Sequence, residues 1–245
     1  LSDIVLLQFL YLNLIPKVMR QPYSQLIKEL RLQKNLSQAE IAKRIGVSRQ
    51  AYLSFEQGKT EFNLSEMIKI ADILGISLDE IKHGVKPDYA KYKQMILAFL
   101  RSNPNVKITK TKLAKLLYLA DFAWFYNNLQ SMSGMAYRKI QYGPVPDSYF
   151  RALDELFEAG SIDIDNTSRD GVFLISETVT GAREKLTSLN ESEYSLIKKI
   201  AKKWHNKRTQ EIVKFTHDQL PYSLCDENEI IPYSLITQEN PENVY

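Results

Sequence analysis

One short segment of the chain carries side chains suited to reading the edges of DNA bases. A helix is predicted over residues 49–57, and four polar residues at its start and along one side lie away from its apolar residues: Ser48, Arg49, Gln50 and Ser54. An arginine can donate two hydrogen bonds to guanine O6 and N7, and a glutamine can bridge adenine N6 and N7. Arg49 and Gln50 are therefore chemically suited to contact base edges.

The elements that would position these side chains form a predicted bundle of five helices, at 22–34, 38–45, 49–57, 64–74 and 78–81. Ser37 and Glu40 form a capping box at the start of the second helix. Gly46 follows that helix, where a tight turn into the next one favours a residue that tolerates positive φ. The segment thus predicts two helices joined by a tight turn.

Basic residues are concentrated in this part of the chain, although the whole chain has a formal charge of only +3. Between residues 20 and 49 there are two acids and seven basic residues: Arg20, Lys28, Arg31, Lys34, Lys43, Arg44 and Arg49. Such a local excess is typical of a surface that faces phosphates. For Lys28, Arg31 and Lys34, a solvated helix face is an equally good explanation.

Residues 36–81, from LSQAEIAKRIGVSRQAY to LGISLDEI, resemble the repressor and Cro-like helix-turn-helix family along their full length. The resemblance implies that the third helix enters the major groove, that Gln38 meets a phosphate, and that Lys59 in the Glu-Gln-Gly-Lys segment also belongs to the DNA-binding residues. It further implies a double-stranded DNA operator with two-fold symmetry, and therefore a homodimer.

The rest of the chain is predicted to be mostly helical with a small β element. Helices are expected from residue 89 onward and over 109–127, 147–159, 191–204 and 209–220, and strands over 135–141, 162–164 and 172–175. The helix over 109–127 is apolar nearly all round, which predicts a central position. We expect a mainly α fold (α+β): a five-helix N-terminal bundle and a helical C-terminal domain that carries a short antiparallel sheet.

These patterns divide the chain into four segments. We expect an apolar extension over 1–19, the helix-turn-helix domain over 20–84, a second domain over 85–225 and an acidic tail over 226–245. The tail has five acids and no Lys or Arg, so we expect it to be extended or loosely docked.

The apolar run at residues 1–15 is shorter than the roughly 20 residues that span a bilayer, and it lacks the features of a signal peptide. We expect residues 1–18 to be an upstream extension before a natural start at Met19, or else an apolar arm used in dimerisation. Neither interpretation implies a membrane protein. Cys225 is the only cysteine, so no internal disulfide is possible and a reducing cytoplasm fits.

Two further motifs, Lys112–Phe122 (KLAKLLYLADF) and Tyr142–Pro146 (YGPVP), resemble the Panacea antitoxin domain, also called SocA-like, over about 89–222. The resemblance implies the antitoxin of a type II toxin–antitoxin pair, which binds a cognate protein toxin and represses its own operon. The residues expected to contact the toxin are Tyr137, Tyr142, Pro144 and Tyr149, although each could simply cover the core. The acidic tail is a further hypothesis, because it could pair with a basic toxin surface.

The sequence predicts no catalytic site, no metal site and no cofactor. His83, His205 and His217 are scattered, no His or Cys pair has metal-ligand spacing, and no glycine-rich phosphate loop is present. We therefore expect a binding protein rather than an enzyme. The alternative function is a one-component transcriptional regulator whose second domain senses a small ligand or a signalling protein through a pocket lined by Trp124 or Phe125.

Overall fold

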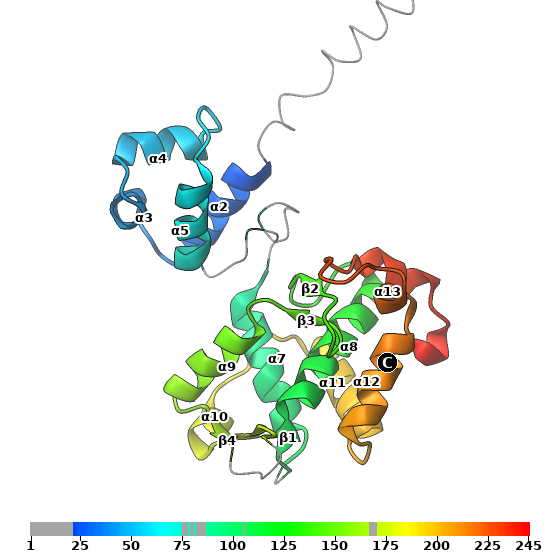
Figure 1. Ribbon diagram of the computed structural model, residues 1–245. Coiled ribbons are helices and arrows are strands. Elements are labelled where there is room, and N and C mark those ends of the chain that lie inside the picture. The colour runs from blue at the N-terminus through cyan, green and yellow to red at the C-terminus, as the bar shows by residue number, and fades with distance from the viewer. Residues whose placement is uncertain (1–21, 75–77, 79–80, 82–86, 105, 167–170) are drawn as a thin grey trace, which may run out of the picture. The chain divides into compact units, whose positions relative to one another are not determined.

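A computed structural model describes residues 22–74, 78, 81, 87–104, 106–166 and 171–245 (Figure 1). The predicted extension over 1–18, and residues 79–80 of the predicted helix over 78–81, lie outside the described residues. The chain divides into two compact units, one ending at Val85 and the other beginning at Lys86. The fold is mainly α with a small β element, as the sequence predicts.

The first unit is a small helix bundle. Its helices are α2 (Pro22–Gln33), α3 (Gln38–Ile45), α4 (Arg49–Glu56) and α5 (Leu64–Leu74). Their apolar faces meet in one core, whose fully buried members include Ile27, Ile41, Tyr52, Phe55 and Ile70. The predicted helices over 22–34 and 49–57 each end one residue earlier than expected.

The local signals at the helix ends operate as predicted. Ser37 Oγ accepts a hydrogen bond from Glu40 N, and the Glu40 carboxylate accepts one from Ser37 N, which completes the capping box. Gly46 ends α3 with a φ of 88°, in the left-handed region. Because glycine has no side chain to clash there, the chain turns directly from α3 into α4.

The second unit is larger and surrounds one long helix. Its elements are α7 (Tyr89–Arg101), β1 (Ile108–Thr109), α8 (Lys110–Asn128), β2 (Tyr137–Arg138), β3 (Val145–Pro146), α9 (Tyr149–Glu158), β4 (Ile162–Asp165), β5 (Leu174–Glu177), α10 (Val179–Arg183), α11 (Glu191–Trp204), α12 (Thr209–Asp218), α13 (Leu220–Ser223) and the 3-10 helices η2 (Tyr233–Gln238) and η3 (Pro241–Asn243). The strands form an antiparallel sheet in the order β1-β5-β4 and a two-stranded ribbon, β2-β3.

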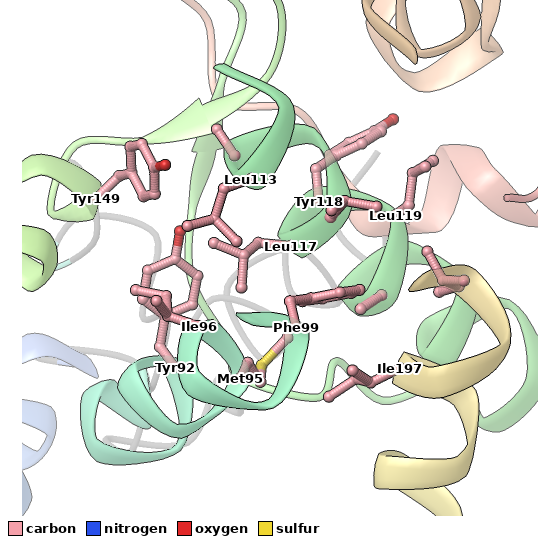
Figure 2. Close-up of a cluster of buried hydrophobic side chains, with 14 of the residues drawn as sticks. Tyr92, Met95, Ile96, Phe99, Leu113, Leu117, Tyr118, Leu119, Tyr149 and Ile197 are labelled. Atoms are coloured by element: carbon pink, nitrogen blue, oxygen red, sulfur yellow. The ribbon is translucent and has the colours of Figure 1, made fainter. Parts of the chain in front are cut away.

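Helix α8 is the centre of this unit, as its apolar sequence predicts. Every residue from Leu113 to Ala123 is buried, and α7, α11, α12 and η2 pack around the helix (Figure 1). Figure 2 shows Leu113 and Leu117 of α8 on the side of that helix that faces the α7 side chains, among them Ile96. Two charged residues, Lys115 and Asp121, are buried with this helix.

The predicted strand over 135–141 is much shorter than expected. Only Tyr137 and Arg138 pair with β3. The backbone here also bonds to the C-terminal segment: Ile231 N donates to Tyr137 O, and Lys139 N donates to Glu229 O. The prediction over 172–175 is likewise displaced, since β5 begins at Leu174.

The C-terminal segment 226–245 is packed into the second unit and is not loosely docked. Ile231, Ile236 and Val244 are at most 2% exposed. The ring of Tyr233 stacks on Phe122 of α8 with ring centroids 4.5 Å apart. The sequence did not predict this packing, because the segment is acidic and its buried apolar residues are too widely spaced to form a helical or strand pattern. The segment therefore contributes to the core, whatever its acids contact.

Candidate functional site

The polar side of α4 faces solvent, as predicted for a helix that contacts DNA. Ser48 caps the helix, because its Oγ accepts a hydrogen bond from Ala51 N at 3.1 Å. Arg49 and Gln50 in the first turn are exposed, and Ser54 is half-buried. On the opposite side, Tyr52 and Phe55 have no exposed surface. The core thus fixes which side chains α4 presents outward.

The other predicted DNA-binding residues are Gln38, at the start of α3, and Lys59, just after the end of α4. Gln38 is the first residue of α3 and is half-buried, and its Nε2 donates to Glu56 Oε2 at 2.9 Å. Lys59 is exposed just after α4, where its backbone N–H donates to Ser54 O. The structure brings Gln38 against the end of α4 through Glu56, a residue that the sequence reasoning missed.

Glu56 also holds a buried ion pair with Arg31. Arg31 Nε lies 2.6 Å from Glu56 Oε1, and Arg31 Nη1 donates to Leu36 O. Burial alone would raise the pKa of Glu56, but hydrogen bonds from Arg31 and Gln38 outweigh it and hold that pKa below its usual value. Arg31 is only 5% exposed, so it stabilises the bundle instead of facing phosphates.

The basic surface of the first unit is therefore smaller than the residue count suggests. Arg31 is paired and buried, and Arg20 lies outside the described residues. Lys34, Lys43 and Arg44 are exposed. No local pattern distinguishes Arg31 from these residues, because its partner is 25 positions away.

The four residues predicted to contact a toxin occupy different environments in the second unit. Tyr137 has no exposed surface, and its hydroxyl donates to Asp121 at 2.8 Å. Pro144 is buried, and Tyr149 is 1% exposed with its hydroxyl donating to Lys110 O. Tyr142 is 68% exposed. Only Tyr142 is thus an accessible surface residue, and burial does not favour Tyr137 as a contact.

Tyr142 and Tyr149 nevertheless share a pocket between the start of α8, the start of α9 and the approach to β5. Its volume is about 260 Å³. Apart from Gly171, the residues that line it are Thr109, Lys110, Thr111, Ala114, Lys115, Ile140, Tyr142, Val145, Tyr149, Phe150, Val172 and Phe173. We call it the α8–α9 pocket. Neither Trp124 nor Phe125 lines it.

Lys115 forms the buried end of this pocket. Its side chain is almost fully enclosed, and its Nζ donates to Pro144 O at 3.0 Å. Burial lowers the pKa of Lys115 to about 7. Gly143 makes room for this arrangement, because a β-carbon there would lie 2.7 Å from Lys115 Cε and 2.8 Å from His217 Nε2.

Asp121, six residues further along α8, organises a second buried network. It accepts hydrogen bonds from Ser133 N at 2.6 Å, from Ser133 Oγ and from Tyr137 OH. Burial raises the pKa of Asp121 to about 6 even though these three bonds favour its charged form. The network ties α8 to the segment that leads into β2.

The histidines of the second unit have structural surroundings. His205 Nδ1 lies 2.8 Å from Asn103 Oδ1, and His217 stacks on the ring of Tyr222. Within the described parts of the chain, no three His, Cys, Asp or Glu side chains come together as metal ligands. The described helices are each too short or too polar to cross a membrane.

Both units match known protein families. Residues 27–81 match the helix-turn-helix family. An uncharacterized HTH-type transcriptional regulator of Methanocaldococcus jannaschii, MJ0272, is 38% identical over 55 residues, which cover 83% of that protein and 22% of this chain. The chain belongs to the HTH-type transcriptional regulators. Its second unit carries a further domain, since residues 113–221 match the antitoxin SocA-like Panacea domain.

Two other relatives share the helix-turn-helix part with this regulator. YqaE of Bacillus subtilis, an uncharacterized HTH-type transcriptional regulator, is 37% identical over 25% of this chain. RstR, a cryptic phage CTXphi transcriptional repressor of Vibrio cholerae, is 34% identical over 24% of this chain. The chain spans 53% of the length of each of these two relatives. No solved structure matches the chain.

Proposed function

We propose that this regulator is the antitoxin of a type II toxin–antitoxin pair, and that it represses its own operon. The observation that carries the proposal is the presence of a helix-turn-helix match and a SocA-like Panacea match on one chain. The first unit would bind an operator as a homodimer, because one helix-turn-helix unit reads only a few base pairs. The second unit would neutralise a toxin by direct contact, without a catalytic step.

The surface of α4 supports the DNA-binding half of the proposal. Arg49 and Gln50 are exposed at the start of a helix that the core holds in place, which is the arrangement that helix-turn-helix domains use to contact bases. Ser48, Ser54, Gln38 and Lys59 would contact the backbone or neighbouring bases. RstR, which is 34% identical over 59 residues, is by its name a transcriptional repressor.

The toxin half of the proposal is tested by expressing the adjacent reading frame with and without this protein. We expect growth arrest from the neighbour alone, relief of that arrest by this protein, and recovery of the two proteins as one complex. Arrest that this protein does not relieve would contradict the proposal. The helix-turn-helix unit alone should leave the arrest in place, which is the matched control.

A second candidate function is a one-component regulator whose second unit binds a small ligand. The α8–α9 pocket is the observation behind this candidate, because it combines apolar walls with two lysines, although neither Trp124 nor Phe125 lines it. A harmless neighbouring gene, together with operator binding that changes when a small molecule is added, would support it over the antitoxin proposal.

A further inference from the structure

The α8–α9 pocket is bordered by apolar side chains that a folded protein ordinarily covers. Four of its lining residues are large and exposed: Tyr142 at 68%, Phe150 at 49%, Phe173 at 43% and Val172 at 39%. They come from the YGPVP turn, from α9 and from the segment before β5. Exposed apolar side chains that gather around one opening mark an interaction site, and aromatic residues are the usual anchors of protein interfaces.

The pocket is also basic. Its described lining includes Lys110 and Lys115 and no Asp or Glu. Lys110 Nζ lies 4.8 Å from the ring centroid of Phe150 and 5.3 Å from that of Phe173, so the amine sits over the aromatic rim. Lys110 and Thr111 belong to the first turn of α8, where the helix dipole adds positive potential.

Among the residues that the structure describes, no carboxylate pairs with Lys115. Its side chain is 2% exposed, and among the described residues its Nζ has one hydrogen-bond partner, the neutral carbonyl of Pro144. His217 Nε2 is buried nearby without a hydrogen-bond partner in the described chain, so it offers no negative charge. A buried amine with a single neutral acceptor is costly unless an anion reaches it. A carboxylate entering the pocket would supply that anion.

The size of the pocket points to a protein partner. A volume of about 260 Å³ is below the roughly 300–1,000 Å³ of typical small-molecule sites, and it suits one or two inserted side chains. The exposed apolar rim extends the contact beyond the pocket, which a larger protein surface can cover and a small molecule cannot. Because the second unit matches an antitoxin domain, the partner that fits is the toxin.

We infer that the α8–α9 pocket is the toxin-docking site, and that the toxin inserts an apolar segment carrying a carboxylate that pairs with Lys115 and Lys110. This inference rests on the proposed function. It assigns the rim residues Tyr142, Phe150 and Phe173 to the apolar part of the contact. It assigns the two lysines to recognition of the acid.

Two phenylalanines on one helix provide the first test. Phe150 and Phe157 both lie on α9 and are 49% and 50% exposed, but only Phe150 lines the pocket. We expect Phe150→Ala to weaken toxin binding at least ten-fold, measured by calorimetry with the full chain and the toxin from the adjacent gene. Phe157→Ala should change it less than two-fold. Equal effects of the two substitutions would contradict the inference.

The charge is tested separately with Lys110→Glu. A negative residue in the first turn of a helix is favourable for the helix, so this variant should fold. We expect at least a ten-fold loss of toxin affinity, which shrinks in high salt. Lys199→Glu on the exposed face of α11 is the control and should change affinity less than two-fold. Lys115→Met should also weaken binding; if it fails to fold by circular dichroism, Lys110→Glu still decides the question.

The outcomes separate this inference from the proposed function. If the wild-type chain relieves growth arrest while Phe150→Ala and Lys110→Glu bind toxin normally, the docking site lies elsewhere and the antitoxin proposal stands. If the wild-type chain neither binds the neighbouring protein nor relieves arrest, the proposed function itself fails. Native mass spectrometry that finds a small carboxylate bound to the wild-type chain but not to Lys115→Met, with toxin binding unchanged in every pocket variant, would overturn the inference in favour of a small ligand.

Discussion

The side chain of Lys115 donates a hydrogen bond of 3.0 Å from its Nζ to the carbonyl oxygen of Pro144, which is 29 positions away. Lys115 belongs to the first Panacea-like motif and Pro144 to the second. The bond therefore joins the N-terminal part of α8 to the YGPVP turn at the α8–α9 pocket. Gly143 is required at this contact, because its φ is +93° and a β-carbon would meet Lys115 and His217.

Replacing Gly143 should destabilise the second unit more than replacing a comparable glycine. Gly160 also has a positive φ, +71°, but a β-carbon there would meet nothing within 4 Å. Gly160→Ala should therefore show only the backbone cost, about 1 kcal/mol. Gly143→Ala adds the steric conflict with a buried lysine, for a total of roughly 2–4 kcal/mol. Urea denaturation of both variants measures the difference, and equal costs would show that Lys115 moves aside freely.

The buried amine of Lys115 should make stability depend on pH. Burial lowers its pKa in the folded chain to about 7 from 10.5. Between these pH values Lys115 is protonated in the unfolded chain and neutral in the folded chain, so stability rises with pH. Below pH 7 Lys115 is protonated in both states, so its effect on stability no longer changes with pH. The free energy of unfolding of the wild-type chain, relative to that of Lys115→Met, should rise by on the order of 4 kcal/mol between pH 7 and 10.5.

The measurement is denaturation of both proteins at several pH values. Among the described residues, the titratable group that faces Lys115 from another element is His217 of α12, whose pKa is lowered by burial and by Lys115 itself. The charge of Lys139 lowers the pKa of His217 and that of Glu227 raises it. Lys110 also lines the pocket. Comparing wild type with Lys115→Met cancels titrations that both proteins share. A difference that stays constant from pH 7 to 10 would contradict the buried, uncompensated amine.

Local sequence signals predicted the helices well, because the information lies within a few residues. The capping box at Ser37, the turn at Gly46 and the bounds of α11 at Glu191 and Trp204 all agree with the structure. These features depend on periodicity and caps, which the chain carries locally. The central position of α8 was predictable for the same reason.

Long-range partners were not predictable in this way. Arg31 resembles the half-buried Lys28 and the exposed Lys34 in sequence, yet it is buried because Glu56 lies 25 positions later. Lys115 is a charged residue in a mostly apolar helix, and it is buried because the YGPVP turn supplies its hydrogen-bond acceptor. No pattern within one segment records which distant segment will supply an acceptor. The same limit applies to the C-terminal segment, where Ile236 is buried although the segment as a whole is acidic.

The packing of this segment changes how the acidic-tail hypothesis must be tested. Deleting 226–245 would remove Ile231, Ile236 and Val244 from the core, so a loss of toxin binding would report unfolding. Charge substitutions at exposed acids, such as Glu227→Gln, leave that core intact. The pairing of these acids with a basic toxin surface stays a prediction.

The ion pair of Arg31 with Glu56 should be essential to the first unit. Glu56→Ala would leave the Arg31 guanidinium buried without a partner, and removing one member of a buried pair costs about 3–5 kcal/mol. It would also release Gln38 from its hydrogen bond at the start of α3. Thermal denaturation measures the stability. The double variant Arg31→Met with Glu56→Met should recover most of it, because no buried charge remains; a single variant as stable as wild type would contradict a buried pair.

Arg49→Ala should separate the two proposed activities of the chain. If Arg49 contacts a base edge, the substitution weakens operator binding by about 1–3 kcal/mol and relaxes base preference at one position, as expected for loss of a bidentate contact. Fluorescence anisotropy with the chain's own promoter DNA, and with each base pair changed in turn, measures both effects. Arg44→Ala on the exposed end of α3 is the control for a phosphate contact and should weaken binding to all DNA sequences alike.

Toxin neutralisation should survive Arg49→Ala, because Arg49 lies in the first unit and the α8–α9 pocket in the second. A folded Arg49→Ala protein that loses both activities would contradict this division between the units.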